Sequence, residues 1–168
     1  WEKRNWDPDN DHLYDAYCCI WASDALYYNG GAVTHSSAYN YRGHLLAARM
    51  AELLGEDPLP YRAEAEAIKK AIDQRLWLPQ QGHWAEYQDL MGLGRRHTAA
   101  ALWSIYTPID CQVGTPQQAD SATRYVDSSL PHIPIEYSVP EKYHSRFQAP
   151  TPAPYTIATS NWMPYDWS

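Results

Sequence analysis

The chain has 168 residues, enough for one domain with a hydrophobic core, and its 45% hydrophobic and 20% charged residues argue against intrinsic disorder. The 13 Lys and Arg against 20 Asp and Glu give a net charge of -7, which disfavours binding to nucleic acid, and no stretch is apolar enough to span a membrane. The 3 cysteines have neither a disulfide-scaffold nor a zinc-site spacing.

The first predicted helix covers His12–Tyr28, with Asp11 as its expected N-cap. Aromatic and small apolar side chains recur in it at three- and four-residue spacing. Asp24 is the only formally charged residue over Ala16–Tyr41, so we expect this helix to be buried on every side. The aspartates before it are spaced like the start of a calcium loop, but His12 stands where that loop needs glycine.

Two more helices are predicted up to residue 76. Thr34 is the expected N-cap of a helix over His35–Leu54, which Gly55 ends in a left-handed conformation. After two prolines, a third helix is predicted over Tyr61–Leu76. Charged side chains occupy much of its surface, so we expect it to be amphipathic and exposed.

The segment His83–Asp89 is too brief for a helix and is predicted to be extended. Its alternation places Trp84, Glu86 and Gln88 on one side and Tyr87 and Asp89 on the other. A fourth helix over His97–Thr107 contains no Asp, Glu, Lys or Arg and is expected to be buried. A fifth over Gln117–Leu130 is amphipathic, with Thr115 as N-cap followed by a proline.

Buried and amphipathic helices therefore alternate along the chain, and no segment has the length or β-branched content of a sheet strand. The sequence predicts an all-α fold. A four-helix bundle would give every helix a polar face, so a two-layer helical toroid explains the pattern better, with residues 1–168 as one incomplete domain. Residues 131–168 are proline-rich and show no helical period, so we expect them to be irregular.

The chemistry of the chain is indicated first by its rings. It has 8 Trp and 14 Tyr but 1 Phe, which favours aromatic side chains that carry a polar group. A flat apolar face beside a hydrogen-bond donor suits a sugar ring, with its C–H faces and hydroxyl rim. The alternative is that these rings fill the core of a large protein.

Three carboxylates are candidates for acid/base catalysis. Asp24 lies in an otherwise uncharged segment, where burial would raise its pKa as a general acid requires. Alternatively, Asp24 caps a neighbouring helix or pairs with Arg42 or Arg49. Glu86 lies between two aromatic neighbours on a segment that leads into a buried helix, and Asp110 follows that helix. No pair of histidines has the spacing of metal ligands on one helix face.

Several motifs resemble the repeating hairpins of six-hairpin glycosidases. They are WASDALYYNGG at 21–31, AYNY at 38–41, AELLG at 51–55, and WAEYQD at 84–89 followed by a His-x-x-x-x-Leu-Trp helix. The resemblance covers roughly residues 7–110 and 160–168 and is closest to uncharacterised bacterial members. It implies part of an (α/α)6 toroid and hydrolysis of a glycosidic bond by a general acid and a water-activating carboxylate, usually with inversion. It also favours a periplasmic or secreted location.

We therefore expect a glycoside hydrolase in which Asp24 is the acid and Glu86 is the base or a sugar-binding carboxylate. The expected substrate-binding residues are Trp21, Tyr28, His35, Tyr41, Trp84, Tyr87, Asp89 and Trp162. The expected partners are an oligo- or polysaccharide and the rest of the toroid or another chain that completes it. No cofactor or metal is expected, and the modest, dispersed acidic charge favours a neutral sugar over a polyanion.

Two alternatives remain open at the level of sequence. A polysaccharide lyase on the same toroid would use Tyr41, His35 and Arg42 for β-elimination, and its unsaturated product would absorb light. A non-catalytic glycan-binding domain would use the rings for affinity and the acids for structure, and it would bind glycan without turnover.

Overall fold

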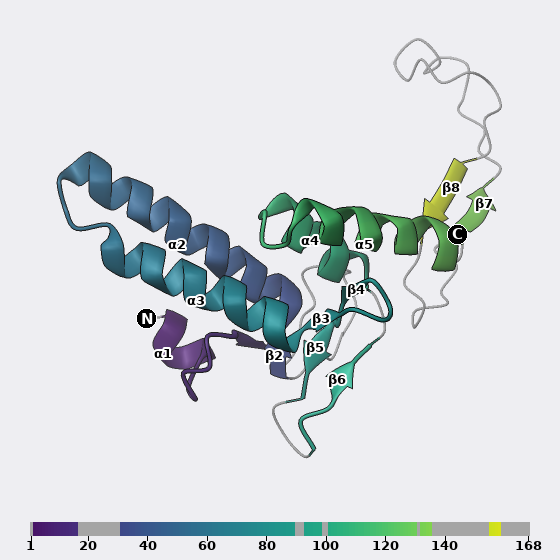
Figure 1. The fold of residues 1–168 in the computed structure, drawn as a ribbon, viewed down its shortest axis with the longest axis horizontal. Helices are drawn as coiled ribbons and strands as arrows, with labels where there is room; N and C mark the ends of the chain where they lie inside the picture. Colours follow the sequence, from purple (N-terminus) through teal and green to yellow (C-terminus); the bar gives the residue numbers. More distant parts are fainter. Residues whose placement is uncertain are drawn as a thin grey trace, which may run out of the picture.

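The computed structural model describes residues 2–16, 31–89, 93–98, 101–130, 132–135 and 155–158. Its helices are α1 (Glu2–Trp6), α2 (Thr34–Leu54), α3 (Leu59–Arg75), α4 (Leu102–Asp110) and α5 (Pro116–Ser129). Its strands are β1 (Asp15–Ala16), β2 (Gly31–Val33), β3 (Trp77–Leu78), β4 (His83–Trp84), β5 (Tyr87–Gln88), β6 (Arg96–His97), β7 (His132–Ile135) and β8 (Tyr155–Ala158). Helices dominate, and the strands are short (Figure 1).

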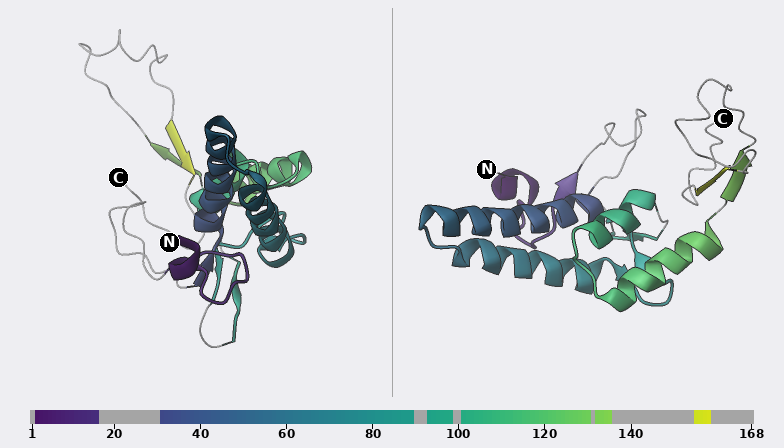
Figure 2. Two further views of the ribbon diagram at one scale, coloured as in Figure 1. Left: turned by 90° about the vertical axis from the view of Figure 1, so that its left-hand side faces the viewer. Right: turned by 90° about the horizontal axis from the view of Figure 1, so that it is seen from above.

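The helices α2 and α3 form a long antiparallel hairpin, and α4 packs against α2 (Figures 1 and 2). Gly55 ends α2 at a φ of 73°, as predicted, because glycine adopts the left-handed conformation without a Cβ clash. Thr34 is not the N-cap; it is the first residue of α2, and its hydroxyl donates to the carbonyl of Ala85 instead. This bond ties the start of α2 to the segment before β5.

The predictions for α3 and α5 are confirmed within two residues at each end. Ala65, Ile68 and Ile72 lie on the buried face of α3, while charged residues such as Glu66, Lys70 and Asp73 are exposed. Thr115 caps α5 by a reciprocal pair of bonds with Gln118: its hydroxyl accepts from the Gln118 backbone N–H, and its own N–H donates to the Gln118 side chain.

An antiparallel sheet of four strands, in the order β1-β2-β5-β6, corrects the all-α prediction. Ala32 lies opposite Asp15 on one side and Gln88 on the other, and Tyr87 lies opposite His97. Strands of two or three residues are too short to show a period in the sequence, which explains why the sheet was missed. The strands β3 and β4 form a separate pair beside it.

The predicted helix over residues 12–28 is wrong over its first five residues. Asp7 turns the chain, because its carboxylate accepts the backbone N–H groups of Asp11 and His12. His12 then has a φ of 65°, which no right-handed helix accommodates. The chain leaves this turn extended, and Asp15 pairs with β2. Residues 17–30 lie outside the described part of the chain.

The fourth helix begins five residues later than predicted and extends to Asp110. His97, its expected first residue, belongs to β6 because its carbonyl accepts the backbone N–H of Glu86. The helix is also less buried than expected: Ser104 and Ile105 are enclosed, but Tyr106 is 47% exposed.

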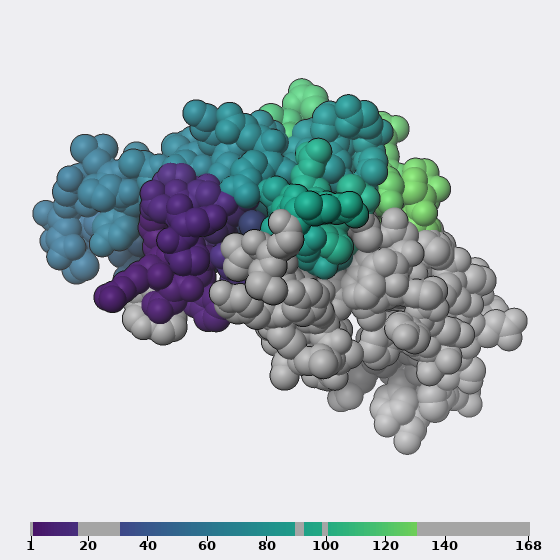
Figure 3. Space-filling view, turned by 90° about the horizontal axis from the view of Figure 1, so that it is seen from below, coloured from purple at the N-terminus to yellow at the C-terminus, as the bar shows by residue number. Residues whose placement is uncertain are grey.

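The core lies where α2, α3, α4 and α5 meet the short strands, and it contains Ile68, Ile72, Trp84, Ile105 and Val126. Figure 3 shows α1 and the turn after it against the side of the α2–α3 hairpin, where the Lys3 ammonium lies 2.5 Å from Glu64 Oε1. Near the C-terminus, β7 pairs with β8, which corrects the expectation of a wholly irregular segment. No helix among the described residues is long and apolar enough to cross a membrane.

Candidate active site

Glu86 lies immediately before β5, where its backbone is bonded on both sides. Its N–H donates to the carbonyl of His97 at 2.9 Å, and its carbonyl accepts the N–H of Thr34 at 3.1 Å. The side chain is 3% exposed, and its Oε1 has no hydrogen-bond partner among the described residues. Burial raises the pKa of Glu86 to about 8, because a carboxylate loses its hydration there. Its carboxyl group is therefore protonated at neutral pH.

Asp15 is a second buried carboxyl group, which the sequence analysis did not single out. It is 6% exposed, and its Oδ2 has no hydrogen-bond partner in the described chain. Burial, together with the negative charges of Asp9, Asp11 and Asp7, raises its pKa to about 6. Asp15 was overlooked because it was assigned to the first turn of a helix, where a polar side chain is ordinarily exposed to solvent.

The two buried carboxyl-bearing residues lie on opposite sides of the central strand β2. Asp15 lies opposite Ala32, which lies opposite Gln88. Glu86 comes two residues before Gln88, and its N–H and C=O bond to opposite neighbouring strands, so it interrupts the regular alternation of β5 as a bulge does. The positions of Asp15 and Glu86 are two strands apart across the sheet and two residues apart along it, roughly 12 Å at the usual spacings.

Three neighbours of Glu86 form a polar and aromatic group at the β5–β6 hairpin. The rings of Tyr87 and His97 stack with centroids 3.9 Å apart. His97 Nε2 lies 3.0 Å from Asp89 Oδ1, and both side chains are partly exposed. Tyr87 and Asp89 were expected from the sequence to bind substrate, and that role stays a prediction. His97 was missed because it was assigned to a buried helix.

The other described candidates are core residues. Tyr41 and Trp84 are 6% and 1% exposed, and Trp84 packs edge-on against Trp77. His35 is 2% exposed and lies edge-on to Trp103, and burial lowers its pKa to about 4. The described chain encloses all three, so their contact with a sugar stays a prediction.

Four candidates, Asp24, Trp21, Tyr28 and Trp162, lie outside the described residues. The two arginines proposed as partners of Asp24 have other carboxylates beside them. Arg42 lies 2.6 Å from Asp110 Oδ2, and Arg49 lies 3.3 Å from Glu52 Oε2. Asp110 is exposed in this ion pair, so nothing about its setting resembles that of Glu86.

One cluster has the composition of a metal site but already includes a cationic side chain. Asp7, His12 and Glu64 bring their ligand atoms within 4.8 Å of one another. The ammonium of Lys3 lies 2.5 Å from Glu64 Oε1, 3.1 Å from His12 Nδ1 and 3.6 Å from Asp7 Oδ2. This ammonium group lies beside all three side chains, and the cluster joins α1 and the following turn to α3.

Comparison with known proteins identifies the family of the chain. Residues 5–151 match the model of the mannosylglycerate hydrolase MGH1-like glycoside hydrolase domain, a six-hairpin glycosidase family, which confirms the resemblance seen in the sequence. A solved structure, the GH78 family rhamnosidase of Bacillus sp. GL1, superposes with a TM-score of 0.59 at 15% identity, covering 77% of this chain and 14% of the rhamnosidase. At that identity the likeness concerns the fold. No curated protein matches the chain. The chain belongs to the MGH1-like glycoside hydrolase family.

Proposed function

We propose that the protein hydrolyses a glycosidic bond by general acid/base catalysis, with Glu86 as the group that donates the proton to the leaving oxygen. The observation that carries this proposal is the buried Glu86 carboxyl, whose raised pKa of about 8 keeps the proton available at neutral pH. The same burial disfavours the role of base suggested by the sequence, since a base must be ionised before it acts.

The second carboxylate, which activates water, is Asp24 or Asp15. Asp24 was expected from the sequence to be the general acid, so this assignment exchanges the roles expected of Asp24 and Glu86. Asp15 is supported by its pKa of about 6, which leaves its carboxyl group ionised at neutral pH. Glu86, with a pKa of about 8, is protonated there, so the two groups are in the states that a base and an acid require. For this pair to act as proposed, the two carboxyl groups must approach to roughly 6.5 to 9.5 Å, the separation at which an inverting enzyme fits a water.

The domain proposed for this chemistry is an (α/α)6 toroid, of which residues 1–168 form part. Two antiparallel helix pairs, α2 with α3 and α4 with α5, support it (Figure 2). The match to 14% of the rhamnosidase agrees with a chain that supplies a fraction of a larger catalytic domain. The proposed partner is a neutral oligo- or polysaccharide, because the acidic charge of the chain is modest and dispersed.

The test is hydrolysis of mannosylglycerate, an aryl mannoside and an aryl rhamnoside, sugars taken from the names of the matching proteins. Glu86→Gln is expected to lower kcat/KM by about 10² to 10⁴-fold, because general acid catalysis is lost. Glu66→Gln on the exposed side of α3 is the matched control and should act as wild type. Asp15→Asn and Asp24→Asn identify the second carboxylate. An unchanged rate for Glu86→Gln would remove it from the mechanism.

The rate should also fall on the alkaline side of its pH profile. As pH rises through about 8, Glu86 loses its proton and kcat/KM should fall. The control Glu66→Gln should keep this alkaline limb. A rate that stays level to well above pH 8 would contradict the acid role of Glu86.

A further inference from the structure

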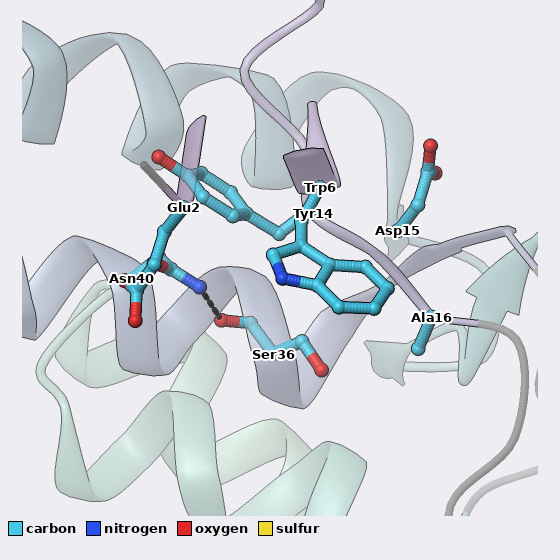
Figure 4. Close-up of a pocket in the computed structure, with 7 residues that line it drawn as sticks. All are labelled: Glu2, Trp6, Tyr14, Asp15, Ala16, Ser36 and Asn40. Atoms are coloured by element: carbon cyan, nitrogen blue, oxygen red, sulfur yellow. Dashed lines mark hydrogen bonds between the residues drawn. The ribbon is translucent and has the colours of Figure 1, made fainter. Parts of the chain in front are cut away.

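A cavity of about 390 Å³ opens between α1, β1 and the first half of α2 (Figure 4). Its volume lies in the range of about 300 to 1,000 Å³ typical of small-molecule sites. Its lining includes Trp6, Tyr14, Asp15, Ala16, Ser36 and Asn40. In Figure 4, Trp6 lies above Ser36, between Asn40 and the pair of Asp15 and Ala16.

The lining combines one accessible indole with short polar side chains. Trp6 is 37% exposed and is one of the residues that line the cavity. The Asn40 side-chain amide donates to the carbonyl of Ser36 at 3.0 Å, which fixes its orientation at the edge of the cavity. Tyr14 is 1% exposed and its hydroxyl lies 3.2 Å from His44 Nε2, so its ring serves as a rigid wall.

This chemistry suits a sugar ring. The apolar C–H face of a pyranose stacks on an indole, while hydroxyl groups at its rim exchange hydrogen bonds with amide and hydroxyl side chains such as Asn40 and Ser36. The described lining contains Glu2 but no lysine or arginine, so it offers no cation to a carboxylated or sulfated sugar. The ligand class that fits is therefore a neutral monosaccharide unit.

We propose that this cavity is a second sugar-binding site, with Trp6 as its stacking platform. The proposal rests on the proposed function, because the cavity reaches Asp15 on the same sheet as Glu86. A glycan unit bound there lies along the chain from the unit whose bond is cleaved. Trp6 then contributes to binding of an oligosaccharide and takes no part in proton transfer.

The experiment measures binding separately from hydrolysis. The Glu86→Gln protein is titrated with methyl mannoside, methyl rhamnoside and methyl glucoside, with saturation-transfer NMR as the readout. Trp6→Ala in the same background is expected to weaken binding of the preferred glycoside at least tenfold, while Trp6→Phe retains most of it because an aromatic face remains. Tyr106→Ala is the matched control, since Tyr106 is an exposed ring outside the cavity and should leave binding unchanged.

Asn40→Ala provides a second variant that leaves α1 intact, and it is expected to weaken binding without changing the circular dichroism spectrum. Equal binding by Trp6→Ala and wild type, or no saturable binding of any of the three glycosides, would overturn the proposal. Hydrolysis is judged apart from this result. If Glu86→Gln keeps full activity while Trp6→Ala loses binding, the acid assignment fails and the sugar site stands.

Discussion

The burial of Glu86 makes the stability of the fold depend on pH. The folded pKa of about 8 exceeds the ordinary glutamate value of 4.5, so the folded state retains a proton that the unfolded chain has already released. The stabilisation this provides is complete below pH 4.5 and is lost as pH rises to about 8. His35 acts in the opposite direction, because its pKa of about 4 lies below the ordinary histidine value of 6.5. Folding therefore loses stability as pH falls from 6.5 to 4.

These windows allow Glu86 to be isolated. Asp15, with a shift from 3.8 to about 6, and His35 titrate mainly below about pH 7. Between pH 7 and 8 the free energy of unfolding should fall by roughly 1 kcal/mol in wild type, at up to about 1.4 kcal/mol per pH unit. Glu86→Gln should remove most of this slope, as measured by urea denaturation at several pH values. Glu66→Gln should keep the slope, and its loss there would assign it to another group.

Gly114 shows how tightly the core restricts a single position. A Cβ atom at Gly114 would lie 2.5 Å from Cζ2 of Trp84, a ring that is 1% exposed and packed on Trp77. We expect Gly114→Ala to lower the free energy of unfolding by about 1 to 3 kcal/mol through overpacking. Gly43→Ala is the control of opposite sign. Nothing lies within 4 Å of its Cβ in the middle of α2, so alanine should stabilise by about 0.5 to 1 kcal/mol. Thermal unfolding of both variants checks the pair.

At the scale of elements, α5 depends on its cap. Thr115 and Gln118 satisfy two backbone N–H groups that the first turn of the helix leaves without partners. Thr115→Ala should cost about 1 kcal/mol, whereas Thr115→Ser should cost much less because the hydroxyl acceptor is kept. Chemical denaturation measures both. Equal losses for the alanine and serine variants would show that the Thr115 methyl group, and not the hydrogen bond, stabilises this end.

The elements predicted correctly from the sequence are those with local signals. Gly55 after α2 and Thr115 before α5 act through their own backbone and nearest turn, so the surrounding fold does not change their effect. The sheet has no comparable signal, because its strands are only two or three residues long and are fixed by partners far along the chain. Asp15 was expected to be helical from the spacing of its neighbours, but it pairs with Ala32 across the sheet. That long-range pairing decides the conformation of Asp15 and Ala16.

The candidate site divides in the same way. Glu86 was found because aromatic neighbours and a following apolar helix mark it locally. Asp15 was not found, since its burial results from β1 pairing with β2 and from the turn at Asp7. His97 was misplaced because its helix-like context conceals its pairing with Tyr87. The burial of Asp15 and the strand position of His97 depend on strand pairing, and helical spacing in the sequence does not predict either of them.

At the scale of the molecule, the α2–α3 hairpin projects away from the short strands (Figure 1), and its far end carries exposed apolar side chains. Met50, Leu53, Leu54 and Leu59 are each 62% exposed or more. A group of this kind is unusual on a monomer and marks a surface that associates. In the proposed toroid, a neighbouring helix pair would cover it.

This surface should make the 168-residue chain self-associate when it is expressed alone. Its sedimentation coefficient is expected to rise with concentration, because association removes the leucine side chains from water. The double variant Leu53→Glu with Leu54→Glu should remain monomeric at the same concentrations and keep its helical circular dichroism. Glu66→Gln, on the exposed side of α3, should associate as wild type does. A wild-type chain that stays monomeric at high concentration would show that these side chains need no cover, and the toroid would lose this support.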